Sequence, residues 1–183
     1  MRVVLGPDDV ARGLRRMAGE IVERHRGTEH LVIVAVRRGG EAVARDLVRA
    51  IRDLEHRDVP LGTVDITLYR DDAATALPNP RIGPSQVPGS LDGKAVVLVD
   101  DVVYTGRTIR AALDALMDYG RPRCIQLAAL IDRGGRELPI QPDFVVRQVD
   151  VGPGERVDVF ERPEGLSAVV QPTSAPSIPP AKP

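Results

Sequence analysis

Apolar residues along the chain fall into short continuous runs that alternate with longer stretches of helical spacing. Three of the runs, at residues 31–36, 94–99 and 124–131, have the length of strands. The run at residues 31–36 contains no polar residue, which is typical of a strand buried on both faces. Residues 43–54 and 109–117 instead place apolar side chains at intervals of three and four, which predicts amphipathic helices. This order predicts an α/β fold, a mainly parallel twisted sheet flanked by helices.

A further helix is predicted near the N-terminus. Apolar residues recur at helical spacing over 10–22, and Asp8 or Asp9 offers a carboxylate that can cap the first turn. Gly13 and Gly19 lie inside this helix, and each weakens it by roughly 1 kcal/mol relative to alanine. The polar faces of the helix carry the arginines Arg12, Arg15, Arg16 and Arg24. We interpret these arginines as a solvated surface, with contact to RNA as the alternative.

The remaining segments are less regular. Short strands are predicted at residues 62–69, 143–147 and 156–161. Residues 70–91 are rich in Pro, Gly, Asp and Ser, and a loop of this length in a compact domain is usually a functional lid or disordered. We interpret it as a flexible hood. The Pro/Ser/Ala-rich end, residues 166–183, is predicted to be a disordered tail, so the folded domain is expected to span residues 1–165.

Composition narrows the range of functions. The 183 residues are 43% hydrophobic and 28% charged, which suits one domain with a proper core. A net charge of −1 and only 3% aromatic residues argue against a general affinity for nucleic acids or membranes and against base-stacking platforms. The single cysteine, Cys124, is expected in the core of a cytoplasmic protein without disulfides. We expect no zinc site, signal peptide or membrane span.

The segment VVLVDDVVYTGRTI, residues 96–109, carries the candidate chemistry. Asp100 and Asp101 follow a buried strand, and two adjacent buried carboxylates are costly unless a partner compensates them. Ligands of open α/β sheets collect at the carboxyl ends of strands. The pair therefore indicates a ligand with hydroxyl groups or a divalent cation. The alternative is a pair of capping aspartates that binds nothing.

The turn that follows the acidic pair favours an anion. It consists of Tyr104, Thr105, Gly106, Arg107 and Thr108 and leads into the predicted helix. The N–H groups and the dipole at a helix N-terminus attract phosphate, and the hydroxyl and guanidinium groups of the turn add to this attraction. A sugar phosphate satisfies both halves of the unit, with its phosphate in the turn and its hydroxyls at the carboxylates.

This segment resembles the phosphoribosyl-pyrophosphate (PRPP) loop of type I phosphoribosyltransferases. Residues 15–27, 62–72 and 113–140 further resemble the PyrR family, which are bifunctional pyrimidine operon regulators and uracil phosphoribosyltransferases. The resemblance covers about residues 8–145 and implies the type I phosphoribosyltransferase fold. It also implies that uracil and PRPP react to UMP and diphosphate, and that uridine nucleotides control binding to the leader of pyrimidine operon mRNA. Relatives form dimers or larger homo-oligomers.

The resemblance assigns a role to each candidate residue. Asp100 and Asp101 hold the ribose hydroxyls, and the turn at residues 104–108 binds the 5′-phosphate. The pyrophosphate is assigned to Arg37, Arg38 and Gly39, with Arg38 as the strongest candidate because guanidinium suits phosphate oxygens. Arg133 is assigned to the base. Mg²⁺ is expected to bind through the substrate, bridging diphosphate and ribose hydroxyls, rather than through direct protein ligands.

Several positions depart from the family pattern, namely Gly19, Arg37, Gly135, Gln141 and residues 146–154. Some of these lie on the presumed RNA face, where each lost phosphate contact lowers the affinity for RNA. Two alternatives to the bifunctional protein follow. One is a nucleotide-sensing RNA-binding regulator with little catalysis, and the other is a phosphoribosyltransferase without RNA regulation, or for another base. All of them require the sugar-phosphate site.

Overall fold

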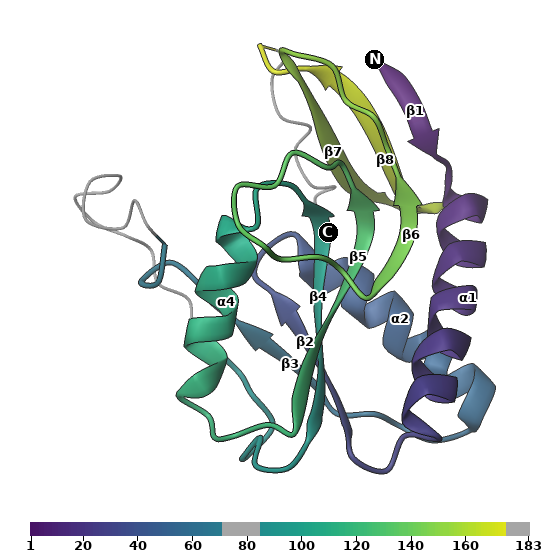
Figure 1. Ribbon diagram of the computed structural model, residues 1–183. Coiled ribbons are helices and arrows are strands. Elements are labelled where there is room, and N and C mark those ends of the chain that lie inside the picture. Colours follow the sequence, from purple (N-terminus) through teal and green to yellow (C-terminus); the bar gives the residue numbers. More distant parts are fainter. Residues whose placement is uncertain (71–84, 175–183) are drawn as a thin grey trace.

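The computed structural model describes residues 1–70 and 85–174 and is built around a five-stranded sheet (Figure 1). The strands lie in the order β3-β2-β4-β5-β6, and each neighbouring pair is parallel. They are β2 (Leu31–Val36), β3 (Leu61–Val64), β4 (Ala95–Val103), β5 (Cys124–Asp132) and β6 (Phe144–Gln148). The predicted α/β class with a parallel sheet is therefore confirmed.

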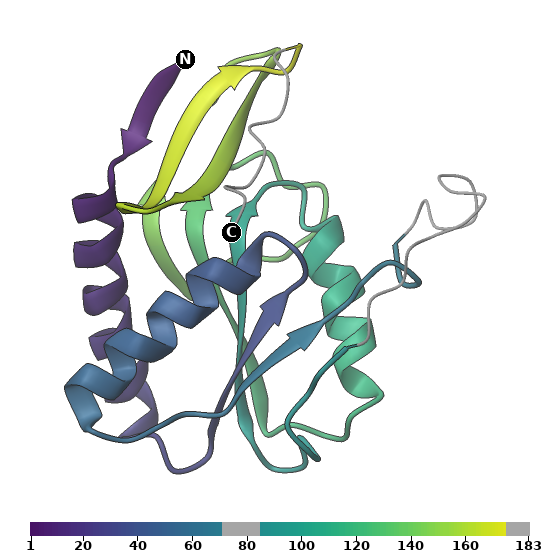
Figure 2. The same cartoon turned by 180° about the vertical axis from the view of Figure 1, so that it is seen from behind.

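Helices cover both faces of this sheet, as the two opposite views show (Figure 2). The helices are α1 (Pro7–His25), α2 (Gly40–Glu55) and α4 (Arg107–Met117). Helices α1 and α2 pack against one face in one hydrophobic cluster, and α4 packs against the other face in a second cluster. Ile33 belongs to the first cluster and its neighbour Val34 to the second. This two-sided burial explains why the run 31–36 contains no polar residue.

The N-terminal cap and the two glycines of helix α1 have roles that differ from those predicted. Gly6 is the N-cap, and the Asp9 carboxylate accepts a hydrogen bond of 3.1 Å from the Gly6 N–H, so Asp9 acts from within the first turn. Gly13 allows close packing, because a Cβ there would lie 2.2 Å from the Val146 side chain on β6. A Cβ at Gly19 would meet nothing within 4 Å.

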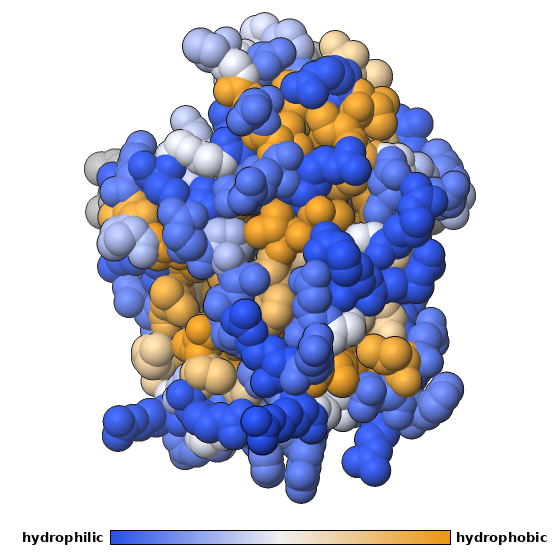
Figure 3. Space-filling view, turned by 45° about the vertical axis from the view of Figure 1, so that its right-hand side comes forward, coloured by the Kyte–Doolittle hydropathy of each residue, from blue (hydrophilic) through white to orange (hydrophobic). Residues whose placement is uncertain are grey.

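A second, smaller sheet joins the two ends of the chain. Its antiparallel strands lie in the order β1-β8-β7. They are β1 (Arg2–Leu5), β7 (Glu155–Arg162) and β8 (Gly165–Pro172). Figures 1 and 2 place this sheet at the end toward which the main strands point. In the space-filling view, hydrophobic surface shows among hydrophilic side chains in this upper part of the molecule (Figure 3).

Two predicted boundaries need correction. The disordered tail was predicted from residue 166, but residues 166–172 lie in β8, so that part of the prediction is wrong. The strand predicted at residues 62–69 ends at Val64, where Asp65 begins a turn by accepting a hydrogen bond of 2.8 Å from the Thr67 N–H. The small N-terminal strand β1 was not predicted.

The predicted hood falls largely outside the described residues, because 71–84 are not among them. The described return of the hood runs along the edge of the main sheet. Gln86 and Thr63 exchange backbone hydrogen bonds of 2.8 and 2.9 Å, forming an antiparallel bridge on β3. Within residues 1–70 and 85–174, no helix is long and apolar enough to cross a membrane.

Candidate active site

The acidic pair lies near the carboxyl end of β4, inside the strand rather than after it. Asp100 is 5% exposed, and its Oδ1 accepts a hydrogen bond of 3.0 Å from the Asp101 N–H. The Asp101 Oδ1 accepts one of 2.7 Å from the Val102 N–H. The local backbone therefore orients both carboxylates at the end of the sheet where ligands of open α/β folds bind.

The protonation of the pair reflects its burial. Removal from water raises the pKa of Asp100 well above its usual range, and the charge of Asp101 raises it further. Burial also raises the pKa of Asp101, while the hydrogen bond from the Val102 N–H opposes this rise. Such a pair is stabilised by a ligand that brings hydroxyl donors or positive charge.

The turn between β2 and α2 packs directly against these carboxylates. A Cβ on Gly39 would lie 2.5 Å from the Asp101 carboxyl group, and one on Gly40 would lie 2.2 Å from the Val99 carbonyl oxygen. The two glycines therefore permit a contact that any other residue would prevent. Arg38 precedes them in this turn, and Arg37 forms an ion pair of 3.4 Å with Glu41 on α2. The peptide bond between Arg37 and Arg38 is cis.

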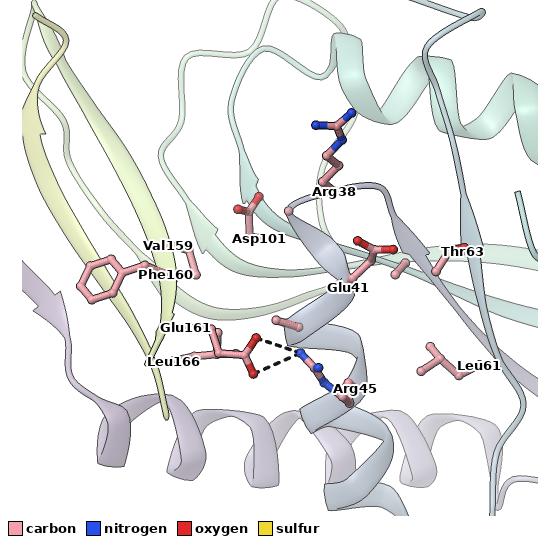
Figure 4. Close-up of a pocket in the computed structure, with 13 residues that line it drawn as sticks. Arg38, Glu41, Arg45, Leu61, Thr63, Asp101, Val159, Phe160, Glu161 and Leu166 are labelled. Atoms are coloured by element: carbon pink, nitrogen blue, oxygen red, sulfur yellow. Dashed lines mark hydrogen bonds and ion pairs between the residues drawn. The ribbon is translucent and has the colours of Figure 1, made fainter. Parts of the chain in front are cut away.

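A cavity of about 590 Å³ opens beside this turn (Figure 4). Three of the predicted site residues, Arg38, Gly39 and Asp101, line it together. The close-up shows Arg38 and Asp101 at the start of α2, with the cavity continuing along that helix toward β7 and β8. Its size is within the range of pockets that bind small molecules.

Other lining residues were not predicted from the sequence. Glu41 and Arg45 are four residues apart on one face of α2, a spacing that was visible in the sequence. Arg45 forms an ion pair of 3.1 Å with Glu161 on β7 (Figure 4). No local sequence pattern indicates that Glu161 lines the cavity, because its position there depends on how the small sheet that contains β7 is placed.

The predicted phosphate turn joins β4 to α4. Gly106 is the N-cap of α4 with a φ of 90°, a left-handed conformation that glycine adopts without strain. The Arg107 N–H lies 3.3 Å from the Thr105 hydroxyl, and the Arg107 side chain pairs with Glu137. Thr108 is exposed in the first turn of the helix. The N–H groups at this end of α4 provide the geometry that binds a phosphate.

Arg133 lies beside the phosphate turn and is not among the residues that line the 590 Å³ cavity. Its guanidinium carbon is 3.9 Å from the centre of the Tyr104 ring, a cation–π contact. Its Nη2 donates a hydrogen bond of 3.4 Å to the Glu155 carbonyl oxygen. Its Nε is buried and has no hydrogen-bond partner among the described residues. The predicted residues thus form two clusters, one on each side of the acidic pair.

The chain matches known proteins over most of its length. Residues 8–165 match the family described as phosphoribosyl transferase domain. The chain is 54% identical over 156 residues to bifunctional protein PyrR of Pelotomaculum thermopropionicum, an alignment that covers 85% of this chain and 86% of that protein. It is 53% identical over 158 residues to bifunctional protein PyrR of Geobacter sulfurreducens, with coverage of 86% and 89%.

The fold also matches solved structures of lower sequence identity. A crystal structure of a hypoxanthine-guanine phosphoribosyltransferase from Bacillus anthracis superposes with a TM-score of 0.70 at 19% identity. The superposition covers 92% of this chain and 98% of that one, and it confirms the type I phosphoribosyltransferase fold. With the fold and the sequence matches in agreement, the chain belongs to the phosphoribosyltransferase family and, within it, to the bifunctional PyrR proteins.

Proposed function

We propose that the chain is a uracil phosphoribosyltransferase, which converts uracil and PRPP to UMP and diphosphate. The observation that carries this proposal is the pair of Asp100, which is buried, and Asp101, which is half-buried. Burial raises both of their pKa values, and the pair lies between the Arg38 turn and the N-terminus of α4. The similarity to proteins named PyrR at 54% and 53% identity supports the same reaction.

Each candidate residue has a role in this proposal. Asp100 and Asp101 accept hydrogen bonds from the ribose hydroxyls, and the turn at residues 104–108 binds the 5′-phosphate. The diphosphate is bound by the segment Arg37, Arg38 and Gly39. Arg133 contacts the uracil, and its buried Nε, which lacks an acceptor among the described residues, is a donor available for a ligand carbonyl group.

The chemistry is a displacement at C1′ of the ribose. The uracil N1 forms a bond to C1′ while the bond from C1′ to the diphosphate oxygen breaks, and the N1 proton passes to solvent. Positive charge develops on the ribose ring, and the ionised aspartates stabilise it. Arg38 stabilises the negative charge of the departing diphosphate.

The site residues also fit the magnesium ion that this fold generally uses with PRPP. Mg²⁺ prefers carboxylate and phosphate oxygens, and among the described residues the main influences that lower the pKa of Asp101 are hydrogen bonds rather than a cationic side chain. We propose that Asp100 and Asp101 would hold the ion only by way of the bound substrate, without direct protein ligands. When bound, it neutralises the charge of the leaving group.

The test is an assay of UMP formation from uracil, PRPP and Mg²⁺. The wild-type protein is expected to form UMP, and the variant Asp101→Asn serves as the background. If the wild type forms no more UMP than this variant, the catalytic proposal is wrong and a nucleotide sensor becomes the better description.

We also propose a second activity, the regulation of pyrimidine operon expression by uridine-nucleotide-dependent binding to the mRNA leader. The relatives are named bifunctional, which supports it. In this proposal the protein acts in the cytoplasm as a homo-oligomer. The arginines of α1 contribute less to RNA binding than their number suggests, because two of them are already paired with carboxylates. Arg12 pairs with Asp9 and Arg16 with Glu20, each at 2.7 Å.

Filter binding to an operon leader transcript at two salt concentrations, with and without UMP, tests this activity. Binding that depends on sequence, weakens with salt and responds to UMP is expected. Retention that is equal for an unrelated transcript would leave a phosphoribosyltransferase without RNA regulation.

A further inference from the structure

The segment that follows β5, residues 133–140, packs onto the proposed phosphate turn. We call it the brace segment. The backbone N–H groups of Glu137 and Leu138 donate hydrogen bonds of 2.9 and 3.1 Å to the Thr105 carbonyl oxygen. A Cβ on Gly106 would lie 3.4 Å from the Leu138 side chain. The phosphate turn thus packs against a segment that is distant in the sequence. The first residue of that segment is Arg133, the proposed base contact.

Arg136 ties this arrangement together. Its Nη1 donates a hydrogen bond of 2.7 Å to the Tyr104 carbonyl oxygen, its Nη2 one of 2.8 Å to the Asp132 carboxylate, and its Nε one of 2.7 Å to the Ile140 carbonyl oxygen. These acceptors lie at the start of the phosphate turn, at the end of β5 and at the end of the brace segment. The planar guanidinium suits this task, because its donors point in fixed directions.

The environment strengthens these contacts. The side chain of Arg136 is 11% exposed and that of Asp132 is 10% exposed, so little water competes with the hydrogen bonds. Arg136 is not among the residues that line the 590 Å³ cavity. It therefore acts on the site through the backbone that it holds.

We propose that Arg136 is a positioning residue for the transferase reaction. By fixing the Tyr104 carbonyl group, it sets the direction in which the N–H groups of residues 105–108 point, and it locks the phosphate turn to the brace segment. This inference rests on the proposed function, because it concerns the 5′-phosphate of PRPP. A small misplacement of a substrate-positioning group is sufficient to slow a reaction about a hundredfold.

The test compares Arg136→Gln and Arg136→Lys with the control Arg16→Gln. Arg16 is a matched residue, because it also joins a carboxylate and backbone carbonyl groups, those of Glu20, Val145 and Val146, but lies on α1. Steady-state kinetics give kcat and the KM for PRPP and for uracil. Calorimetry gives the Kd of ribose 5-phosphate, and thermal melts monitor folding.

For Arg136→Gln we expect the KM for PRPP and the Kd of ribose 5-phosphate to rise by about 10- to 100-fold, with a smaller change in the KM for uracil. Arg136→Lys is expected to lie between this variant and the wild type, because an ammonium group reaches fewer of the acceptors. Arg16→Gln is expected to change the melting temperature alone. A purely structural role for Arg136 predicts the same pattern as this control.

The proposal is overturned if folded Arg136→Gln binds ribose 5-phosphate and PRPP as the wild type does. If Arg136→Gln does not fold, the KM for PRPP and the Kd of ribose 5-phosphate measured for Arg136→Lys decide whether the proposal holds. If the wild type forms no UMP, the catalytic proposal fails, and the Kd of ribose 5-phosphate alone then decides the role of Arg136.

Discussion

Two neighbouring strands of the main sheet end in buried acids whose surroundings differ. Val103 of β4 pairs with Asp132 of β5, so the acidic pair of β4 lies close to the acid of β5 along the sheet. Asp132 is 8% exposed and accepts hydrogen bonds of 2.8 Å from Arg136 and 2.9 Å from the Gly134 N–H. Asp100 is 5% exposed, and the charge that raises its pKa is that of another carboxylate, Asp101.

The contrast separates a structural acid from a functional one. The charge of Asp132 is compensated within the protein by Arg136, and this pair fixes the loop that follows β5. In the acidic pair on β4, burial disfavours the charged form of both carboxyl groups, and the charge of Asp101 further disfavours that of Asp100. A ligand that brings hydroxyl donors or positive charge would stabilise this pair. Burial alone therefore does not support a substrate site, whereas burial without a cationic partner among the described residues supports the one proposed at Asp100 and Asp101.

The largest expected effect tests the functional acid. Asp101→Asn removes a charge that stabilises the transition state, so we expect kcat/KM for UMP formation to fall by about 10²- to 10³-fold. Initial rates with uracil, PRPP and Mg²⁺ measure it. The control is Asp58→Asn, whose side chain is 81% exposed and pairs with Arg52. A loss of less than tenfold would contradict the assigned role.

The structural acid is expected to affect folding most. Asp132→Asn leaves the Arg136 guanidinium buried without its counter-charge, and breaking such a pair typically costs about 3 kcal/mol. Urea denaturation, monitored by circular dichroism, gives the free energy of unfolding. A change below about 1 kcal/mol would place Asp132 among the weakly coupled surface acids instead.

The packing of the β2–α2 turn provides the next comparison. Gly40→Ala forces a Cβ to within 2.2 Å of the Val99 carbonyl oxygen, and such overpacking is expected to cost about 2 kcal/mol of stability. Gly39→Ala instead displaces the Asp101 carboxyl group, so activity should fall more than stability. The control, Gly19→Ala, has open space and is expected to stabilise α1 by up to about 1 kcal/mol. Melting temperatures and rates of UMP formation distinguish the three.

The smallest expected effect is a gain in stability. Asp100→Asn removes a buried acid whose pKa burial raises, and we expect the ligand-free protein to gain about 1 kcal/mol at neutral pH. The pKa of Asp100 is near 3.8 when it is unfolded and higher when it is folded. The folded wild type therefore binds more protons, and it loses stability as the pH rises from 3.8 through the folded pKa.

Melting temperatures across this pH range check the sign of the effect. The difference between Asp100→Asn and the wild type should be absent at the acidic end and complete above the folded pKa. A difference that is constant with pH would show that ionisation of Asp100 is not its cause.

The sequence predicted those parts of the fold that local patterns determine. The run at residues 31–36 became a strand because both of its faces are buried, which an unbroken apolar run records directly. The strand at residues 124–131 is fully buried only from Leu127 onward, after Gln126. In the small sheet, the strand predicted at residues 156–161 corresponds to β7, whereas β1 was missed because its partner is distant, as with Val3 and Val169. Residues 166–172 read as the start of a Pro-rich tail, since only their partners on β1 and β7 make them a strand.

In the candidate site, too, features set by local sequence patterns were predicted and features set by distant contacts were not. Asp101, Arg38 and Gly39 were assigned to one site and do line one cavity, because strand ends of a parallel sheet converge. The surroundings of Arg133 were not predictable. They depend on Tyr104, whose ring lies so close to Gly135 that a Cβ there would be 2.5 Å away, and on the φ of +71° at that glycine. Such a contact depends on loop geometry that no periodic pattern encodes.

The placement of β8 between β1 and β7 has a consequence for synthesis on the ribosome. Strand β1 leaves the exit tunnel long before β8 and has no hydrogen-bonding neighbour in its sheet until residues 165–172 have followed. Leu166, which lines the cavity, arrives with them. The nascent chain is therefore expected to form its parallel sheet first and to complete the wall of the cavity only after residues 165–172 have been synthesised.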